Sequence, residues 1–426
     1  MPQARRPKRQ RLAAFTALAV AAVAAIVVAP AAGAAVPPPP QIDARAWVLI
    51  DAGDGARLAA HDANRPLPIA STTKLMTAYL ALHSLRPKER LTTPESATVP
   101  GVPGEALLGL EPGERDTVHD LLYGMLLPSG GDAALTLADG VAGSVDAFVA
   151  RMNAAAERLG LDHTHYATPV GLDTPGNYST AADLAKLAAI LLRDRHFRRI
   201  VDSPRATLRG GAEVRRVVNR NDLVGRVPWV NGVKTGYTLG ARYVLVASGR
   251  QHGVQLIAAT LGAPSEAARD LDSLELLRYG FSLYRPRSVV AAGERLARPP
   301  VRYRGARLAL LAAHAVRLWA RPGEPVDVRA HVPASVAGPV RRGRKVGTAT
   351  VATGDAARAT VALRSARSVP PPSVPGGLEE FVPGSPSRAI VGAIGLAALA
   401  LGLGLAAALA RSRTTGRLPA RRRRAA

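Results

Sequence analysis

Hydrophobic and polar positions near the start of the chain predict a β-hairpin followed by a helix. Residues 46–51 are mainly apolar, a Gly53-Asp54-Gly55 turn follows, and residues 57–61 complete the pattern of two short antiparallel strands. Residues 72–85 are mostly apolar and contain neither proline nor glycine. This stretch predicts a helix that begins next to Ser71.

Strand and helix signals continue to about residue 285. Within them, residues 183–195 predict an amphipathic surface helix with solvated charges. Residues 286–368 are rich in arginine and have short apolar runs separated by Gly-Pro and Pro-Gly pairs, a pattern that predicts a small β-sheet. We therefore expect a larger mixed domain over 36–285 and a small β-rich domain over 286–368. The strand candidates of the small domain are 289–290, 316–319, 326–332 and 346–351.

Both ends of the chain carry signals for a membrane location. Residues 1–35 have a basic start, an apolar run and a small-residue Ala32-Gly33-Ala34 site, which predicts a secretory signal peptide, with an uncleaved anchor as the alternative. Residues 369–388 are rich in Pro, Gly and Ser and predict a linker. Residues 389–410 are uncharged and long enough to span a bilayer as a helix. The arginines of 411–426 predict a cytoplasmic tail, so the body is expected outside the cell membrane.

The net charge of +24 changes its meaning once these segments are set apart. Five basic residues lie in 1–35 and eight in 388–426, so the body between them carries +11. Part of the excess positive charge therefore belongs to the segments that would set the orientation in the membrane. We expect no nucleic-acid partner. The absence of cysteine excludes disulfides and thiolate chemistry. His163 and His165 have no third ligand at metal-binding spacing, so no metal site is expected there.

Candidate chemistry begins at Ser71-Thr72-Thr73-Lys74. The chain has six lysines among 56 basic residues, so a lysine at position 74 is notable, because lysine can lose its proton when buried and arginine cannot. Residues three apart lie on one helical face, which would bring Lys74 close to the Ser71 hydroxyl. Alone, the pattern leaves two interpretations open: a serine that caps the helix and a nucleophile beside its base.

Two later stretches favour the catalytic interpretation. Ser129-Gly130-Gly131 follows an apolar run, and Lys234-Thr235-Gly236 comes later in a predicted strand. Each is ordinary by itself. In this order, a Ser-x-x-Lys, a second serine triplet and Lys-Thr-Gly form the signature of penicillin-interacting serine enzymes.

The chain resembles the D-alanyl-D-alanine carboxypeptidases, which are low-molecular-mass penicillin-binding proteins. The likeness covers about 245 residues and includes residues 69–77, 107–134, 159–187 and 231–248. It implies an α+β fold: a penicillin-binding protein/β-lactamase-like transpeptidase domain, with an antiparallel sheet flanked by helices plus a helical subdomain. A small β-rich domain and a C-terminal transmembrane helix would follow. The implied location is the cell membrane, with a single pass and an extracytoplasmic catalytic domain.

The resemblance also implies a mechanism without a cofactor. Ser71 would attack the carbonyl between two D-alanines of a peptidoglycan stem peptide, Lys74 would be the base, and Ser129 would pass the proton to the leaving amine. Burial and the charge of Lys234 would lower the pKa of Lys74. β-Lactam antibiotics would acylate the same serine. The implied substrate-binding residues are Lys234 and Thr235 for the terminal carboxylate, Gly236 for close approach of the strand, and Tyr237 for the oxyanion, together with the Ser71 amide.

Two departures from the family pattern bear on activity. The second motif is usually Ser-x-Asn, and here Gly131 removes the amide; a lost contact of this kind costs about 10² to 10³ in rate where it serves the transition state. We therefore expect Gly131→Asn to leave the rate unchanged or raise it, and we assign no role to Asp132. Arg242 stands where small residues are usual and is expected to point to solvent. The alternatives left open are a DD-endopeptidase, a β-lactamase, and a weakly active or non-catalytic wall-binding protein.

Overall fold

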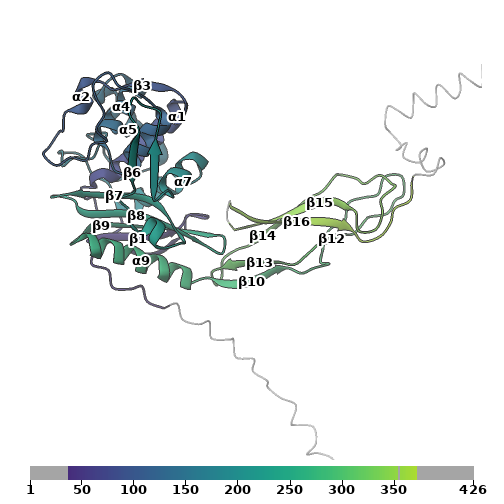
Figure 1. Cartoon of the computed structure of the whole chain (residues 1–426). Coiled ribbons are helices and arrows are strands. Elements are labelled where there is room, and N and C mark those ends of the chain that lie inside the picture. The colour runs from purple at the N-terminus through teal and green to yellow at the C-terminus, as the bar shows by residue number, and fades with distance from the viewer. Residues whose placement is uncertain (1–36, 354–355, 372–426) are drawn as a thin grey trace, which may run out of the picture. The chain divides into compact units, whose positions relative to one another are not determined.

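The computed structural model describes residues 37–353 and 356–371 (Figure 1). Its secondary structure belongs to the unit from Pro40 onward. The sheet of the larger domain has five antiparallel strands in the order β2-β1-β9-β8-β7. The predicted N-terminal hairpin is confirmed, and its first strand also pairs with a strand from the far end of the domain. The bounds are β1 Ala46–Asp51, β2 Arg57–His61, β7 Val230–Thr238, β8 Arg242–Gln251 and β9 Val254–Ala263.

Both faces of this sheet are covered. Side chains of successive strand residues point to opposite faces, and in β1 Val48 and Ile50 join one hydrophobic core while Trp47 and Leu49 join the other. All six residues of β1 are buried. The apolar run of residues 46–51 is therefore explained by a central strand between two layers of helices.

Helix α9 (Glu266–Ser282) lies along one face of the sheet (Figure 1). Its buried Leu276 and Leu277 belong to the same core as Leu49 and Leu256. A Cβ at Gly280 would come within 2.6 Å of Leu256 Cδ1 and 2.9 Å of Leu49 Cδ2. The missing side chain thus lets helix and sheet pack closely.

A group of helices packs against the other face. Its core includes Leu75, Leu122, Leu137 and Leu184. Side-chain oxygens at several helix starts accept backbone N–H bonds, as at Thr117, Ser144 and Thr180. The helical elements are the 3₁₀ turn Ala70–Thr73, α1 Lys74–Ser84, α2 Glu95–Thr98, α3 Val118–Leu126, α4 Gly131–Ala142, α5 Val145–Leu159, α6 Ala181–Leu191, α7 Arg195–Val201 and α8 Leu223–Arg226. Two small antiparallel sheets accompany them, β3 Arg90–Thr92 with β4 Arg115–Thr117 and β5 Arg205–Leu208 with β6 Arg215–Val218.

The single surface helix predicted over 183–195 is wrong in two respects. The chain forms α6 and α7 with a break between them, and Asp194 caps α7 by accepting from His196 and Phe197 N–H groups. Asp183 is buried, and its carboxylate accepts from His163 N and Thr164 Oγ1. A charge that looked solvated in the sequence instead ties a loop to the helix.

A second five-stranded antiparallel sheet follows, in the order β11-β12-β16-β15-β14. The four strand candidates predicted here fall on strands, and three further strands were missed, among them β16, whose Ala- and Arg-rich sequence gives a weak signal. Strands β10 and β13 pair separately. The bounds are β10 Arg285–Val290, β11 Arg295–Ala297, β12 Leu310–Ala312, β13 Val316–Ala320, β14 Asp327–His331, β15 Lys345–Thr353 and β16 Ala356–Ser365.

The predicted α+β class is confirmed. The signal peptide, the transmembrane helix at 389–410, the basic tail and most of the linker lie outside the described residues. Among those that are described, no single helix has the length and hydropathy of a membrane span. Helices α4 and α5 meet that test only as a pair, and they are bent by 83° where they meet.

The close contact at Gly280 can be tested by filling it. Gly280→Val puts methyl groups where Leu49 and Leu256 already lie, and we expect a loss of about 2 kcal/mol in unfolding free energy from overpacking. Thermal or denaturant unfolding measures it. Arg278→Ala, at an exposed position of the same helix, is the control and should change stability by less than about 0.5 kcal/mol. Equal stability of the two variants would contradict the packing argument.

Candidate active site

Ser71 lies in the 3₁₀ turn that leads into α1. The turn is held by Thr72, whose backbone N–H and hydroxyl both donate to the Ile69 carbonyl. Ala70 before it has a positive φ of 48°, which is unfavourable for a residue with a Cβ. Ser71 caps neither the turn nor α1. Its hydroxyl instead accepts from Lys74 Nζ at 3.2 Å, so the capping interpretation is excluded.

Lys74 is only 2% exposed. Its ammonium also donates to the Val170 carbonyl at 2.8 Å. Burial lowers the pKa of Lys74 to about 8, while the carboxylates of Glu105 and Asp132 oppose that change and Arg220 adds to it. An amine with a pKa near 8 has a substantial neutral fraction around neutrality, as a general base requires.

The loop that supplies Val170 packs directly on the nucleophile turn. Thr77 Oγ1 donates to the Pro169 carbonyl at 2.7 Å. Gly171 has a φ of 90°, and a Cβ there would lie 2.0 Å from the Ala70 carbonyl oxygen. Only glycine fits this contact. Asp173, at the end of the loop, accepts from Thr238 Oγ1 at 2.6 Å and Gly240 N at 2.9 Å, which fixes the loop to the end of β7.

The second serine and the second lysine form a matching pair. Ser129 lies between α3 and α4 with a φ of 75°, a strained conformation of the kind that concentrates at functional sites. Lys234 on β7 is 1% exposed, and its Nζ donates to Ser129 Oγ at 3.1 Å and to the Thr235 carbonyl at 3.0 Å. Burial lowers the pKa of Lys234 well below its usual value, and the charge of Lys74 lowers it further.

The influence of one lysine on the other therefore differs from what the sequence predicts. Lys234 is expected to lower the pKa of Lys74, whereas the like charge that acts on Lys74 comes from Arg220. Burial is the largest cause that lowers the pKa of both lysines, and the charge of Lys74 lowers the pKa of Lys234 further.

Strand β7 passes beside the nucleophile. It is an edge strand of the five-stranded sheet. A Cβ at Gly236 would lie 3.0 Å from the Ile69 carbonyl oxygen and 3.1 Å from Ser71 N. The sequence predicts glycine at position 236 so that the strand can approach the substrate. In the fold, the contact between β7 and the turn that carries Ser71 already requires a residue without a side chain at this position. Tyr237 is exposed and packs against Tyr243, with ring centroids 4.5 Å apart and the ring planes tilted by 38°.

A cavity of about 1000 Å³ opens above these groups. Ser71, Lys74, Ser129 and Thr235 line it, whereas Lys234 lies beneath. The sequence did not indicate three other lining residues with charged side chains, Glu105, Arg220 and Arg269. Arg269 comes from α9 and is paired with Asp270 at 2.8 Å and Glu266 at 3.0 Å. No local motif marks these three, because they reach the cavity from separate segments.

A family model described as D-alanyl-D-alanine carboxypeptidase matches residues 32–265, more than half of the chain. The chain belongs to this family. D-Alanyl-D-alanine carboxypeptidase DacC of Escherichia coli K12 is 37% identical over 259 residues, which are 58% of this chain and 63% of that protein. DacF of Bacillus subtilis 168 is 31% identical over 316 residues, 72% of this chain and 80% of that protein. The chain spans a little under two thirds of DacC.

Solved structures agree with this membership. Penicillin binding protein 5 from Haemophilus influenzae superposes with a TM-score of 0.56 and 30% identity, covering 78% of this chain and 99% of that one. The Streptomyces K15 DD-transpeptidase gives a TM-score of 0.55 and 31% identity over 58% of this chain and 100% of its own. The fold of this carboxypeptidase-family chain is therefore that of the penicillin-binding proteins.

The two departures from the family pattern have different outcomes. Arg242 begins β8, is exposed, and is absent from the cavity lining, so its predicted direction toward solvent is confirmed. Gly131 begins α4, and a Cβ there would lie 2.2 Å from Glu105 Oε1. An asparagine side chain would have to displace that carboxylate. The contact argues against the expectation that Gly131→Asn leaves the rate unchanged or higher, which stays a prediction.

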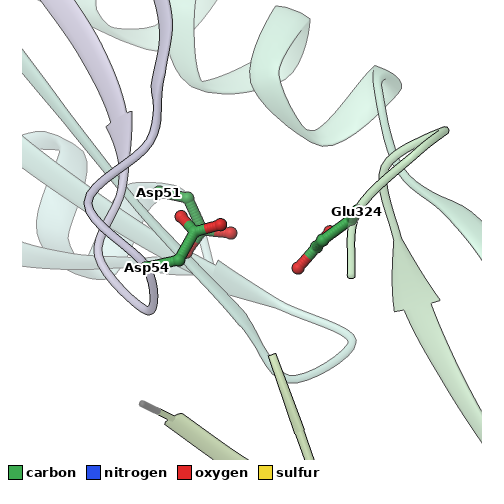
Figure 2. Close-up of side chains that lie close together, drawn as sticks. All are labelled: Asp51, Asp54 and Glu324. Carbon is green, nitrogen blue, oxygen red and sulfur yellow. The ribbon is translucent and has the colours of Figure 1, made fainter. Parts of the chain in front are cut away.

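Two groups of residues resemble metal ligands in their side-chain types, His163 with His165 and Asp51 with Asp54 and Glu324. In both groups, side chains already have partners within the protein. The His165 ring is bonded to the Gly176 carbonyl at 2.6 Å and stacks on Tyr178. Figure 2 shows the carboxyl groups of Asp51, Asp54 and Glu324 close together. Arg321 pairs with Asp54 and Glu324, and Arg358 lies 3.6 Å from Asp51. These guanidinium groups already supply the positive charge that a metal ion would bring.

The pKa of Lys74 is directly measurable. With ¹³Cε-labelled lysine, we expect the Lys74 resonance to titrate with a midpoint of about 8, because burial disfavours the ammonium. Lys74→Arg removes the resonance and so assigns it. A midpoint at or above the ordinary value of 10.5 would contradict the buried environment.

Proposed function

We propose that this chain is a serine-type D-Ala-D-Ala carboxypeptidase, which removes the terminal D-alanine of peptidoglycan stem peptides through an acyl-enzyme on Ser71. One observation carries the proposal: Lys74 Nζ lies 3.2 Å from Ser71 Oγ at a cavity of about 1000 Å³, in a member of the carboxypeptidase family. No cofactor takes part in this reaction.

Acylation begins with removal of the Ser71 proton. Serine is a weak nucleophile until a base takes that proton, and neutral Lys74 is within hydrogen-bond reach. The Ser71 oxygen then bonds to the carbonyl carbon between the two D-alanines. In the proposed reaction, the amide hydrogens of Ser71 and Tyr237 bind the developing oxyanion. The close approach of Gly236 to the nucleophile turn supports this assignment.

The leaving amine needs a proton when the C–N bond breaks. Ser129 Oγ lines the cavity and accepts from Lys234 Nζ at 3.1 Å. In the proposed path, the proton taken by Lys74 reaches the amine through Ser129, and Lys234 orients the Ser129 hydroxyl. D-Alanine departs, and water then hydrolyses the acyl-enzyme, with Lys74 again as the base.

The preference for a free chain end has support in the cavity wall. Thr235 offers a hydroxyl, and Arg269 and Arg220 add positive charge beside a terminal carboxylate. Lys234 lies beneath Ser129, and its Nζ donates to the Ser129 hydroxyl. In place of the expected contact with the carboxylate, we therefore assign Lys234 to the orientation of Ser129. The edge strand β7 offers backbone groups along which an extended peptide can bind.

The release of D-alanine tests this function. We expect the purified full-length chain to release D-alanine from a stem pentapeptide, and Ser71→Ala to lower the rate by roughly 10⁴-fold or more, because the covalent route is lost. Ser84→Ala, at an exposed serine near the other end of α1, is the matched control and should retain the rate.

Penicillin separates this function from the alternatives. We expect a stable adduct on Ser71, seen by mass spectrometry in the wild type and absent from Ser71→Ala. Rapid hydrolysis of penicillin without an adduct would favour a β-lactamase. A folded wild type that forms no adduct and releases no D-alanine would favour a non-catalytic wall-binding protein.

We further propose that the chain is a single-pass membrane protein with residues 36–388 outside the cytoplasm. Support comes from the sequence: the signal-like residues 1–35, the uncharged span 389–410 and the arginines that follow it. The full-length chain should sediment with membranes and resist extraction by high salt, whereas a chain ending at Ser387 should not sediment with them. If the shortened chain stays in the membrane, the N-terminal segment is an uncleaved anchor instead.

A further inference from the structure

The carboxylate of Glu105 occupies the space beside Gly131. A Cβ at position 131 would lie 2.2 Å from Glu105 Oε1 and 3.0 Å from Cδ, far closer than ordinary contact. Both residues are next to the serine of the second motif: Gly131 is two residues after Ser129, and Glu105 lines the cavity with Ser71, Lys74 and Ser129. Gly131 thus makes room for an acidic side chain that comes from a different loop.

That loop is fixed to the start of α4. Gly131 N donates to the Ala106 carbonyl at 2.7 Å. Asp132 is fully buried, and its carboxylate accepts from the backbone N–H groups of Leu108, Gly109 and Leu110 at 2.7–3.0 Å. Asp132 is therefore engaged with the loop backbone rather than turned to the cavity. The position of Glu105 follows from these four bonds.

The two oxygens of Glu105 differ. Oε2 accepts from Gly101 N at 2.7 Å. Oε1 is buried and has no hydrogen-bond partner among the described residues. A buried acceptor without a donor costs free energy, about 1–3 kcal/mol and more for a charged group. An unpaired carboxylate oxygen on a residue that lines the same cavity as Lys74 therefore points to a role in the reaction. The start of α4 also favours a negative charge at this place.

We propose that Glu105 is a positioning residue for the reaction at Ser71. Its buried carboxylate oxygen, which lies against Gly131, stabilises the positive charge that Lys74 acquires when it takes the proton of Ser71. The inference rests on the proposed function for its chemistry. In this proposal, the carboxylate of Glu105 occupies the space that a side chain at position 131 would otherwise fill.

The proton balance is simple. Ser71 Oγ loses a proton, Lys74 Nζ gains it, and the ammonium lasts until the proton moves on to the leaving amine. Burial destabilises that ammonium. Glu105 offsets part of the cost through charge attraction and keeps Lys74 basic enough to accept the proton. Val170 O and Ser71 Oγ hold the nitrogen in place during this exchange.

Other charges act on Lys74 or face the same cavity, and a test must keep them constant. Asp132 also raises the pKa of Lys74, and Arg220 lowers it. The remaining ionisable groups along the cavity wall are Asp173, Asp222, Tyr237, Tyr243, Glu266 and Arg269, with Lys234 beneath it. A test must therefore change Glu105 with as little disturbance of shape as possible.

Glu105→Gln removes the charge and keeps the shape. We expect the midpoint of the Lys74 ¹³Cε titration to fall from about 8 by roughly 1 pH unit. The pH profile of Ser71 acylation by a fluorescent penicillin should shift in the same direction. Its plateau should fall roughly threefold, because a weaker base accepts the proton less readily. Glu111→Gln, at an exposed glutamate that is not among the residues lining the cavity, is the control and should leave both midpoints unchanged.

Gly131 gives an independent route to the same change. Gly131→Ala places a methyl group on Glu105 Oε1 and should displace the carboxylate, with a similar fall in the Lys74 midpoint. In a Glu105→Ala background the space is free, so Gly131→Ala should add little further effect. Gly131→Asn should lower acylation at least tenfold when Glu105 is present, and the combination with Glu105→Ala should bring acylation back only to the level of Glu105→Ala alone.

The inference is overturned if the Lys74 midpoint stays at its wild-type value in both Glu105→Gln and Gly131→Ala while the proteins remain folded by thermal unfolding. It is equally overturned if the effects of Glu105→Ala and Gly131→Ala simply add. The titration needs no substrate, so failure of the carboxypeptidase assignment would appear separately, as a wild type that shows the shift in Lys74 but releases no D-alanine.

Discussion

The burial of two lysine side chains beside two serines is the constraint on which the rest of the site depends. Lys74 and Lys234 are 2% and 1% exposed, and a buried ammonium is costly unless it is hydrogen-bonded. Each donates to one serine hydroxyl and one backbone carbonyl. To supply those acceptors, the chain adopts positive φ at Ala70 and Ser129, each at a cost of the order of 1–3 kcal/mol. The surrounding sheet and helices offset that cost.

Three glycines bring the walls of the site together. Gly171 lets the loop of Val170 approach Ala70, Gly236 lets β7 approach Ser71, and Gly131 leaves room for Glu105. In each case a Cβ would lie 3.1 Å or less from an atom of the neighbouring segment. The reactive groups are thus held by contacts between five segments that are far apart in sequence, and a side chain at any of these positions would displace a neighbouring group rather than fill a void.

The sequence predicts those parts of the site that have a local signal. Ser71 and Lys74 are one helical turn apart, and the β1–β2 hairpin has its apolar run and its Gly53-Asp54-Gly55 turn. The break between α6 and α7 was missed because Asp194 acts as a cap, which an amphipathic pattern does not reveal. Glu105 was missed for a different reason. Its position depends on bonds from Gly131 and Asp132 to a loop without periodicity, and those bonds exist only after the chain has folded.

The glycine in the second motif therefore has a different meaning in the fold than in the sequence. In the sequence it is a lost amide, and a lost contact predicts a slower enzyme. In the fold, the same absence admits a carboxylate, and a carboxylate acts on Lys74 by charge where an amide acts only by hydrogen bonding. Burial lowers the pKa of Lys74, and Glu105 and Asp132 raise it again, so that it stays at about 8. Replacing an amide by a charge near a buried base changes the pH at which that base works more than it changes the geometry, because the two oxygens of Ser71 and Val170 already fix the nitrogen.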